Sequence, residues 1–246
     1  MAGHDDACRD LSHLDQSITM ERYHLQDTGF TLIELLIAMG ISLLLLAGIY
    51  NFCISQVKTY AVQDQLVEMQ QNARMGLDLL VRALEVAGYD PLETRAFGIT
   101  RDDFLASNDA ELALTTDREL YFTADWNENG SIDNSADERF GFRVNSHSLQ
   151  QALISPADGQ ISAWQSVVEN IESMTITYTY ADGTESADVG LPDNSLPGRT
   201  LHDIRMVTIT ITAKTRQPDY GYTHPTLGDH YRRITLTAKV LLRNQG

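Results

Sequence analysis

The stretch Gly29-Phe-Thr-Leu-Ile-Glu-Leu-Leu-Ile-Ala-Met-Gly-Ile-Ser-Leu-Leu-Leu-Leu-Ala-Gly-Ile-Tyr50 decides the fold of this chain. From Phe30 to Tyr50 its residues are apolar or small, apart from the carboxylate of Glu34. This length meets the roughly 20 residues that a helix needs to cross the apolar core of a bilayer, and a helix satisfies its own backbone in lipid. The stretch therefore predicts a membrane-spanning helix that carries one unusual residue, since an acid inside such a segment costs about 2.5–3.5 kcal/mol to insert.

The helical pattern continues beyond this stretch. Apolar residues recur at spacings of three and four, as on one face of an amphipathic helix. These residues are Leu66, Met69, Ala73, Leu77, Leu80, Leu84 and Ala87. No proline interrupts residues 30–87, and Gly88 followed by Pro91 favours a helix end there. We therefore expect one helix, about 85 Å long at 1.5 Å per residue, with an apolar part over residues 30–50 and an amphipathic continuation over residues 51–88.

After this helix the apolar residues alternate with polar ones, which is typical of half-buried antiparallel strands. The alternating stretches are 120–124, 140–144, 174–180, 207–213 and 234–242. In the first of them, Leu120, Phe122 and Ala124 are expected on the buried face and Tyr121 and Thr123 on the exposed face.

The regions between these strands are rich in Gly, Pro, Asp and Asn, which predicts loops over residues 90–117 and 181–203. The expected fold class is α+β, with the long N-terminal helix packed on an antiparallel β-sheet head domain formed by residues 89–246. The core of the head is expected where the Leu80 face of the helix meets the apolar faces of the strands.

Charge and motif content exclude several classes of function. The chain has 34 acidic and 18 basic residues and a formal net charge of -16, which argues against nucleic acid as a partner. An acidic balance favours cation binding. The sequence has no Gly-x-Ser-x-Gly elbow and no phosphate-binding glycine loop. We therefore predict that the protein is not an enzyme.

One polar segment has the composition of a calcium loop. Residues 125–133 read Asp-Trp-Asn-Glu-Asn-Gly-Ser-Ile-Asp and fit the first nine positions of an EF-hand loop. The expected ligands are Asp125, Asn127, Asn129, the carbonyl of Ser131, and Asp133. Position twelve is Ala136, so the closing Glu is missing there, and Asp137 or Glu138 can substitute in a longer loop. Calcium of millimolar affinity is one hypothesis, and a polar hairpin turn without an ion is the other.

The residues Gly29-Phe-Thr-Leu-Ile-Glu34 resemble the prepilin signature of type IV pilins and type II secretion pseudopilins. The resemblance implies cleavage after Gly29 by a prepilin peptidase and methylation of the new Phe30 amine. It also implies an assembly ion pair between Glu34 and the Phe30 amine of a neighbouring subunit. Residues 1–29 would then be a leader, and Met20 is expected to be the true start.

The segment from Gln70 to Tyr89, with its Ala-Arg pair and Ala-Gly-Tyr ending, resembles PilW-type minor pilins, which are related to J-type pseudopilins. This implies a structural subunit in the priming or tip complex of a type IV pilus. The alternative is a J-type pseudopilin of a type II secretion system. A lower alternative is a tip adhesin with its own ligand. The loop around His224 and His230 also carries Tyr220, Tyr222 and Tyr231. These residues are expected to be surface packing, and a subunit-contact or adhesive loop is the alternative.

The same resemblance implies the partners and the location. The expected partners are other minor and major pilins through the N-terminal helix, a prepilin peptidase and an inner-membrane assembly platform. The protein is expected to cross the inner membrane once, with its head in the periplasm, and then to enter the pilus.

Overall fold

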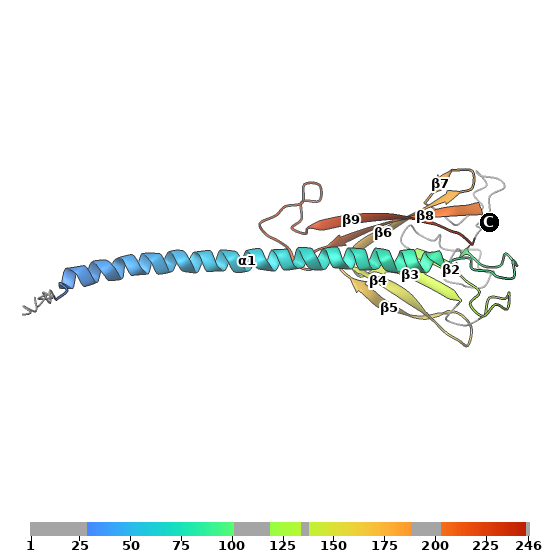
Figure 1. Ribbon diagram of the computed structural model, residues 1–246, viewed down its shortest axis with the longest axis horizontal. Helices are drawn as coiled ribbons and strands as arrows, with labels where there is room; N and C mark the ends of the chain where they lie inside the picture. The colour runs from blue at the N-terminus through green and yellow to red at the C-terminus, as the bar shows by residue number, and fades with distance from the viewer. Residues whose placement is uncertain (1–28, 101–118, 134–137, 188–202, 245–246) are drawn as a thin grey trace, which may run out of the picture. The chain divides into compact units, whose positions relative to one another are not determined.

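The computed structural model describes residues 29–100, 119–133, 138–187 and 203–244. Within these residues one long helix precedes nine strands, which form two antiparallel sheets (Figure 1). The expected α+β class is confirmed, with one correction, because the strands form two sheets where one was predicted. By its internal contacts the chain divides into two units, one ending at Ile54 and one beginning at Ser55.

Helix α1 spans Leu32–Glu85, close to the predicted limits. Its last turn tightens, because Ala87 N donates to Leu84 O at 3.1 Å and Tyr89 N donates to Val86 O at 3.1 Å. Bonds of this i→i+3 type commonly close a helix end. Gly88 follows with a φ of 72°, the left-handed conformation of a glycine cap.

The second part of α1 buries one stripe of residues. The buried positions are Met69, Ala73, Gly76, Leu80 and Leu84, and Ala87 is buried just past the helix end. Leu66 and Leu77, also predicted for this face, are partly buried. Gly76 was not predicted, because periodicity counts apolar side chains. A Cβ there would lie 3.5–3.8 Å from Leu149, Ile171 and Ile211, so the helix backbone comes close to both sheets at this point.

Two sheets build the head. The first has the order β1-β2-β3-β4-β5 and comprises β1 (Ile99–Thr100), β2 (Glu119–Thr123), β3 (Arg139–Asn145), β4 (Ser148–Ile154) and β5 (Ile161–Glu169). The second has the order β7-β6-β8-β9 and comprises β6 (Ile171–Tyr180), β7 (Glu185–Ser186), β8 (Ile204–Lys214) and β9 (Arg233–Leu241). One residue, Asn170, separates β5 from β6, and its φ is 63°. The chain therefore changes sheet at a sharp corner.

The core lies where the second part of α1 meets the inner faces of the two sheets. The predicted inner faces are confirmed for β6 at Met174, Ile176 and Tyr178, and for β8 at Val207, Ile209, Ile211 and Ala213. Figure 1 shows β4 and β5 on one side of this part of α1 and β6, β8 and β9 on the other. The Leu80 face therefore serves both sheets.

The alternation in β2 was misinterpreted. Tyr121 and Thr123, predicted to be exposed, are 3% and 2% exposed. Thr123 Oγ1 accepts a hydrogen bond from Gly98 N at 3.1 Å, and the Tyr121 ring lies 6.4 Å from the ring of Trp164. Strand β2 is therefore covered on both faces.

Candidate functional site: the α1 start and the 125–138 loop

The start of α1 carries a reciprocal cap. Thr31 N and Thr31 Oγ1 both donate to Glu34 Oε2 at 2.9 Å, and Glu34 N donates to Thr31 Oγ1 at 3.3 Å. This is a capping box, in which residue N3 closes the cap residue and the cap residue closes N3. The sequence interpretation gave Glu34 an intersubunit role alone and missed Thr31, although Thr-x-x-Glu before an apolar run is the signature of such a cap.

The predicted cleavage position lies just outside this cap. Gly29 and Phe30 precede the helix, and Phe30 is 88% exposed. A Cβ added at Gly29 would meet nothing within 4 Å. Within the described residues, nothing therefore requires glycine at position 29, and a requirement for it would come from another protein.

The first part of α1 offers apolar surface on every side. Each residue from Gly29 to Ser55 is exposed. In the part of the chain that the structure describes, α1 is the one helix long and apolar enough to cross a membrane. An exposed apolar surface of this extent marks contact with a membrane or another protein.

The second candidate site is the segment after β2. Asp125 is fully buried, and its two carboxylate oxygens accept the N–H groups of Asn129 at 3.1 Å and Gly130 at 2.9 Å. The side-chain amides of Asn127 and Asn129 both donate to one oxygen, Asp133 Oδ2, at 2.8 Å. The loop therefore turns its polar side chains inward.

Hydrogen bonds from backbone N–H groups to the Asn side chains complete this turn. Asn127 Oδ1 accepts Asn129 N–H at 3.0 Å, and Asn129 Oδ1 accepts Ser131 N–H at 2.7 Å. Gly130 has a φ of 72°, a left-handed conformation that glycine adopts without a steric cost. The structure brings together Asp125, Asn127, Asn129 and Asp133, whereas Asp137 lies outside the described residues.

A buried acid follows the loop. Glu138 is 1% exposed, and its Oε2 accepts Asp133 N–H at 2.6 Å. Its Oε1 has no hydrogen-bond partner among the described residues. Arg139 Nε donates to Asp133 O at 3.0 Å. Burial lowers the pKa of Arg139, and the charge of Glu138 acts in the opposite direction.

The loop is attached to the end of α1. Asp125 N donates to Tyr89 O at 2.7 Å, and Gly88 N donates to Thr123 O at 3.0 Å. The rings of Tyr89 and Trp126 lie 6.1 Å apart. The loop therefore joins the helix end to the β2 strand. Within the described residues, no group of three or more His, Cys, Asp or Glu side chains is placed to hold a metal by itself.

The aromatic loop before β9 is held by ion pairs. Arg233 donates to Glu172 at 2.5 and 2.8 Å and to Asp229 at 2.6 and 2.8 Å. These bonds hold the pKa of Glu172 below its usual range and lower the pKa of Asp229 to about 2. Tyr220 is 81% exposed, with its ring 5.3 Å from that of His230. The loop is therefore braced at its base and presents an aromatic ring at its surface.

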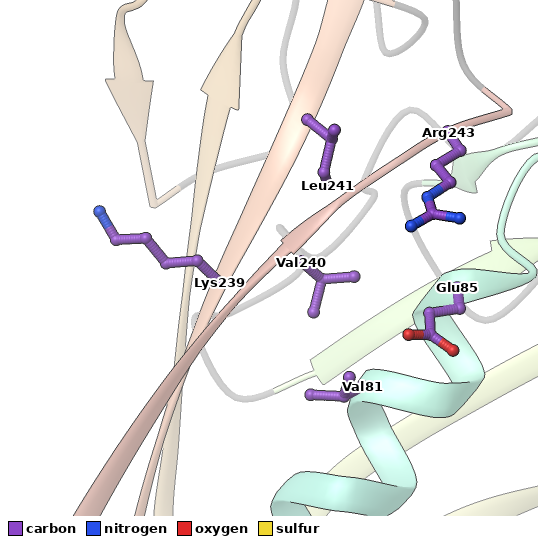
Figure 2. A pocket seen from close by; sticks show the side chains of 6 residues that line it. All are labelled: Val81, Glu85, Lys239, Val240, Leu241 and Arg243. Carbon is purple, nitrogen blue, oxygen red and sulfur yellow. The ribbon is translucent and has the colours of Figure 1, made fainter.

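A hollow of about 270 Å³ lies beside α1 and the edge strand β9. Its lining residues are Val81, Glu85, Lys239, Val240, Leu241 and Arg243. In Figure 2 the Lys239 side chain points away from the helix, while Val240 lies between the strand and Val81. The lining combines three apolar side chains with those of Glu85, Lys239 and Arg243.

Comparison with known proteins identifies the class of protein to which the N-terminal segment belongs. Residues 26–50 match the model of the prokaryotic N-terminal methylation motif. This match covers Gly29, Phe30 and Glu34, and it identifies the apolar start of α1 as a prepilin-type N-terminus.

Residues 62–227, more than half of the chain, match the model of prepilin peptidase-dependent protein B. The chain belongs to this family of type IV pilin-like proteins. Among solved structures, a type IV-like pilin from Thermus thermophilus is 14% identical, covering 72% of this chain and 97% of that one with a TM-score of 0.42. No curated protein matches the chain.

Proposed function

We propose that this protein is a PilW-type minor pilin that acts in the priming or tip complex of a type IV pilus. Its role is structural. The prepilin motif at the start of an apolar helix is the observation that carries the proposal. The exposed surface of residues 29–55 supports it, because such a surface requires lipid or other helices around it.

In this proposal a prepilin peptidase cleaves after Gly29 and the Phe30 amine is methylated. The inner membrane holds the apolar part of α1 until an assembly platform moves the subunit into a filament. Other minor and major pilins then replace lipid around the helix. The head, in the periplasm before assembly, offers its surface to neighbouring subunits.

Glu34 would fix the position of neighbouring helices in the filament. A carboxylate in apolar surroundings is costly unless a cation pairs with it. The new Phe30 amine of an adjacent copy is such a cation. The capping box gives Glu34 a competing role within its own helix, because Thr31 already donates two hydrogen bonds to it.

Two substitutions separate these roles. Glu34→Gln keeps a side chain that can close the capping box but removes the charge, whereas Thr31→Ala removes the cap and keeps the charge. We expect Glu34→Gln to abolish incorporation into pili and Thr31→Ala to reduce it at most a few-fold. Incorporation is measured by immunoblotting of sheared pili, and head folding by the melting temperature.

Normal incorporation of Glu34→Gln would contradict the ion pair. Gly29→Ala tests the processing step, since the fold accepts a side chain there. We expect this variant to remain uncleaved in membranes. Secretion defects without pilus defects in the same strains would support a J-type pseudopilin instead.

A further inference from the structure

We propose that residues 125–133 and Glu138 form a calcium site, in which Glu138 takes the place of the closing acid that the motif lacks at Ala136. This inference does not depend on the proposed role in the pilus. The convergence of the loop side chains and the unpartnered oxygen of Glu138 carry it.

The loop and Glu138 contain enough oxygen donors for calcium, which binds six to eight oxygen ligands. Asp125, Asp133 and Glu138 supply carboxylates. Asn127 and Asn129 supply amide oxygens, and Ser131 supplies its backbone carbonyl. Each amide oxygen accepts one backbone N–H and has a second lone pair for an ion.

The inward arrangement exists without the ion. Two amide groups reach the same oxygen of Asp133 at 2.8 Å, so Asn127, Asn129 and Asp133 already surround one point. Asp125 holds the turn from inside through the N–H groups of Asn129 and Gly130. Binding would move the amide N–H groups off Asp133 and leave the backbone of the turn in place.

Glu138 is the independent sign of a ligand. Its carboxylate is 1% exposed and is bound to the loop through Asp133 N at 2.6 Å. Its other oxygen has no hydrogen-bond partner within the described ranges. A buried carboxylate oxygen without a partner is costly, and a cation in the adjacent loop would remove that cost.

Among the residues that the structure describes, the acidic side chains form no group of three that could hold a metal without other ligands. The site therefore depends on the two Asn side chains and the Ser131 carbonyl, which predicts weak binding, with a Kd of about 10⁻⁴ to 10⁻³ M as in extracellular calcium modules. Arg139 is the competing explanation, because its charge can balance Glu138 without any ion.

The test is the melting temperature of the processed full-length chain in detergent, measured in about 10 mM calcium and in EGTA. At roughly ten times the upper Kd, we expect calcium to raise the melting temperature by about 3–6 °C. A melting temperature that is the same in calcium and in EGTA would overturn the proposal and leave the pilin role intact.

Glu138→Gln and Asp125→Asn are expected to weaken calcium binding at least about tenfold and to lose this shift. Asp158→Asn is the matched control, because Asp158 is an exposed acid in another turn, where its Oδ1 accepts Gln160 N–H. The difference between calcium and EGTA is compared within each variant, so a purely structural effect of the substitution cancels. If Glu138→Gln kept the full calcium-dependent rise in melting temperature, Glu138 would not be a ligand. The proposal would then be overturned at this residue, and Arg139 would be its counter-charge.

Terbium luminescence locates the ion. Trp126 is the second residue of the loop and sensitises terbium bound there, whereas Trp164 lies in β5. Trp126→Phe should remove most of the emission, and Trp164→Phe should keep it. The reverse result would place the ion elsewhere and overturn the assignment.

Discussion

Residues 29–54 and the second unit, which begins at Ser55 and contains the rest of α1 and the head, differ in how they place apolar and charged groups. In the first region Leu44 is 76% exposed, and Glu34 is bonded to its neighbour Thr31. In the second unit Leu80 is fully buried, and Arg233 is paired with two acids, Glu172 and Asp229. The second unit buries its own apolar side chains and pairs its own charges. Residues 29–54 leave apolar surface that only a membrane or another protein can cover. One continuous α1 can therefore belong to two different environments.

The strongest test of this comparison replaces one leucine in each part of α1. We expect Leu80→Ala to lower the free energy of unfolding by about 3 kcal/mol, because it leaves a cavity among both sheets. Leu44→Ala should change it by less than about 0.5 kcal/mol. Urea unfolding followed by tryptophan fluorescence measures this, since Trp126 and Trp164 both lie in the head. Equal losses in the two variants would contradict the comparison.

A smaller effect is expected from the charges of the head. The hydrogen bonds of Arg233 lower the pKa of Glu172 and lower that of Asp229 to about 2. An acid whose pKa is lowered by folding stabilises the folded protein at pH values above its ordinary pKa. This stability is lost as the pH falls through the pKa of the folded state. The melting temperature should therefore fall between about pH 4 and pH 2.

Arg233→Met should flatten this acid dependence and lower the melting temperature at neutral pH by less than Leu80→Ala does. Arg82→Met is the control, because Arg82 is exposed on α1. Melting curves at several pH values measure the slope. A slope unchanged in Arg233→Met would show that other groups cause the acid sensitivity.

The smallest effect is expected at glycine. Gly76 lies mid-helix, and an added Cβ would have ordinary contacts at 3.5 Å or more. Gly76→Ala should therefore stabilise the head by about 0.5–1 kcal/mol through helix propensity, whereas Gly76→Leu should destabilise it. Gly40→Ala should not change head unfolding, because Gly40 lies in the first region. Destabilisation by Gly76→Ala would mean that the core has no space there.

The helix and the inner faces of β6 and β8 were predictable from the sequence because their signals are long and regular. The stripe containing Met69, Ala73 and Leu80 follows the 3.6 period, and β6 and β8 follow the period of two. The long apolar run and the prepilin motif before it were equally direct. The capping role of Glu34 had a local signature in Thr31, which the interpretation passed over.

Strands β4 and β5 were missed for a physical reason. Their pairing contains register shifts between Leu149 and Gln150 and between Leu153 and Ile154, which break the alternation. Strand β5 is an edge strand, and Val168 is its one buried residue. The division into two sheets depends on the corner at Asn170. The alternation of apolar and polar residues gives no information about such a corner. Glu138 was considered as a ligand, but its burial could be known only from the fold.

The corner at Asn170 constrains how the length of this chain can change. A residue inserted beside it would shift β6 by one position and exchange Ile176 and Tyr178 with the threonines between them. A strand can absorb one extra residue in a β-bulge. The pairing of β6 already contains a register shift between Ile171 and Ser173, directly after this corner. Asn170 is also tied to other elements, because it donates to Glu68 at 3.3 Å and accepts from Lys214 N at 2.9 Å. Insertions and deletions are therefore expected to be excluded at Asn170, while the loops elsewhere in the chain can differ in length.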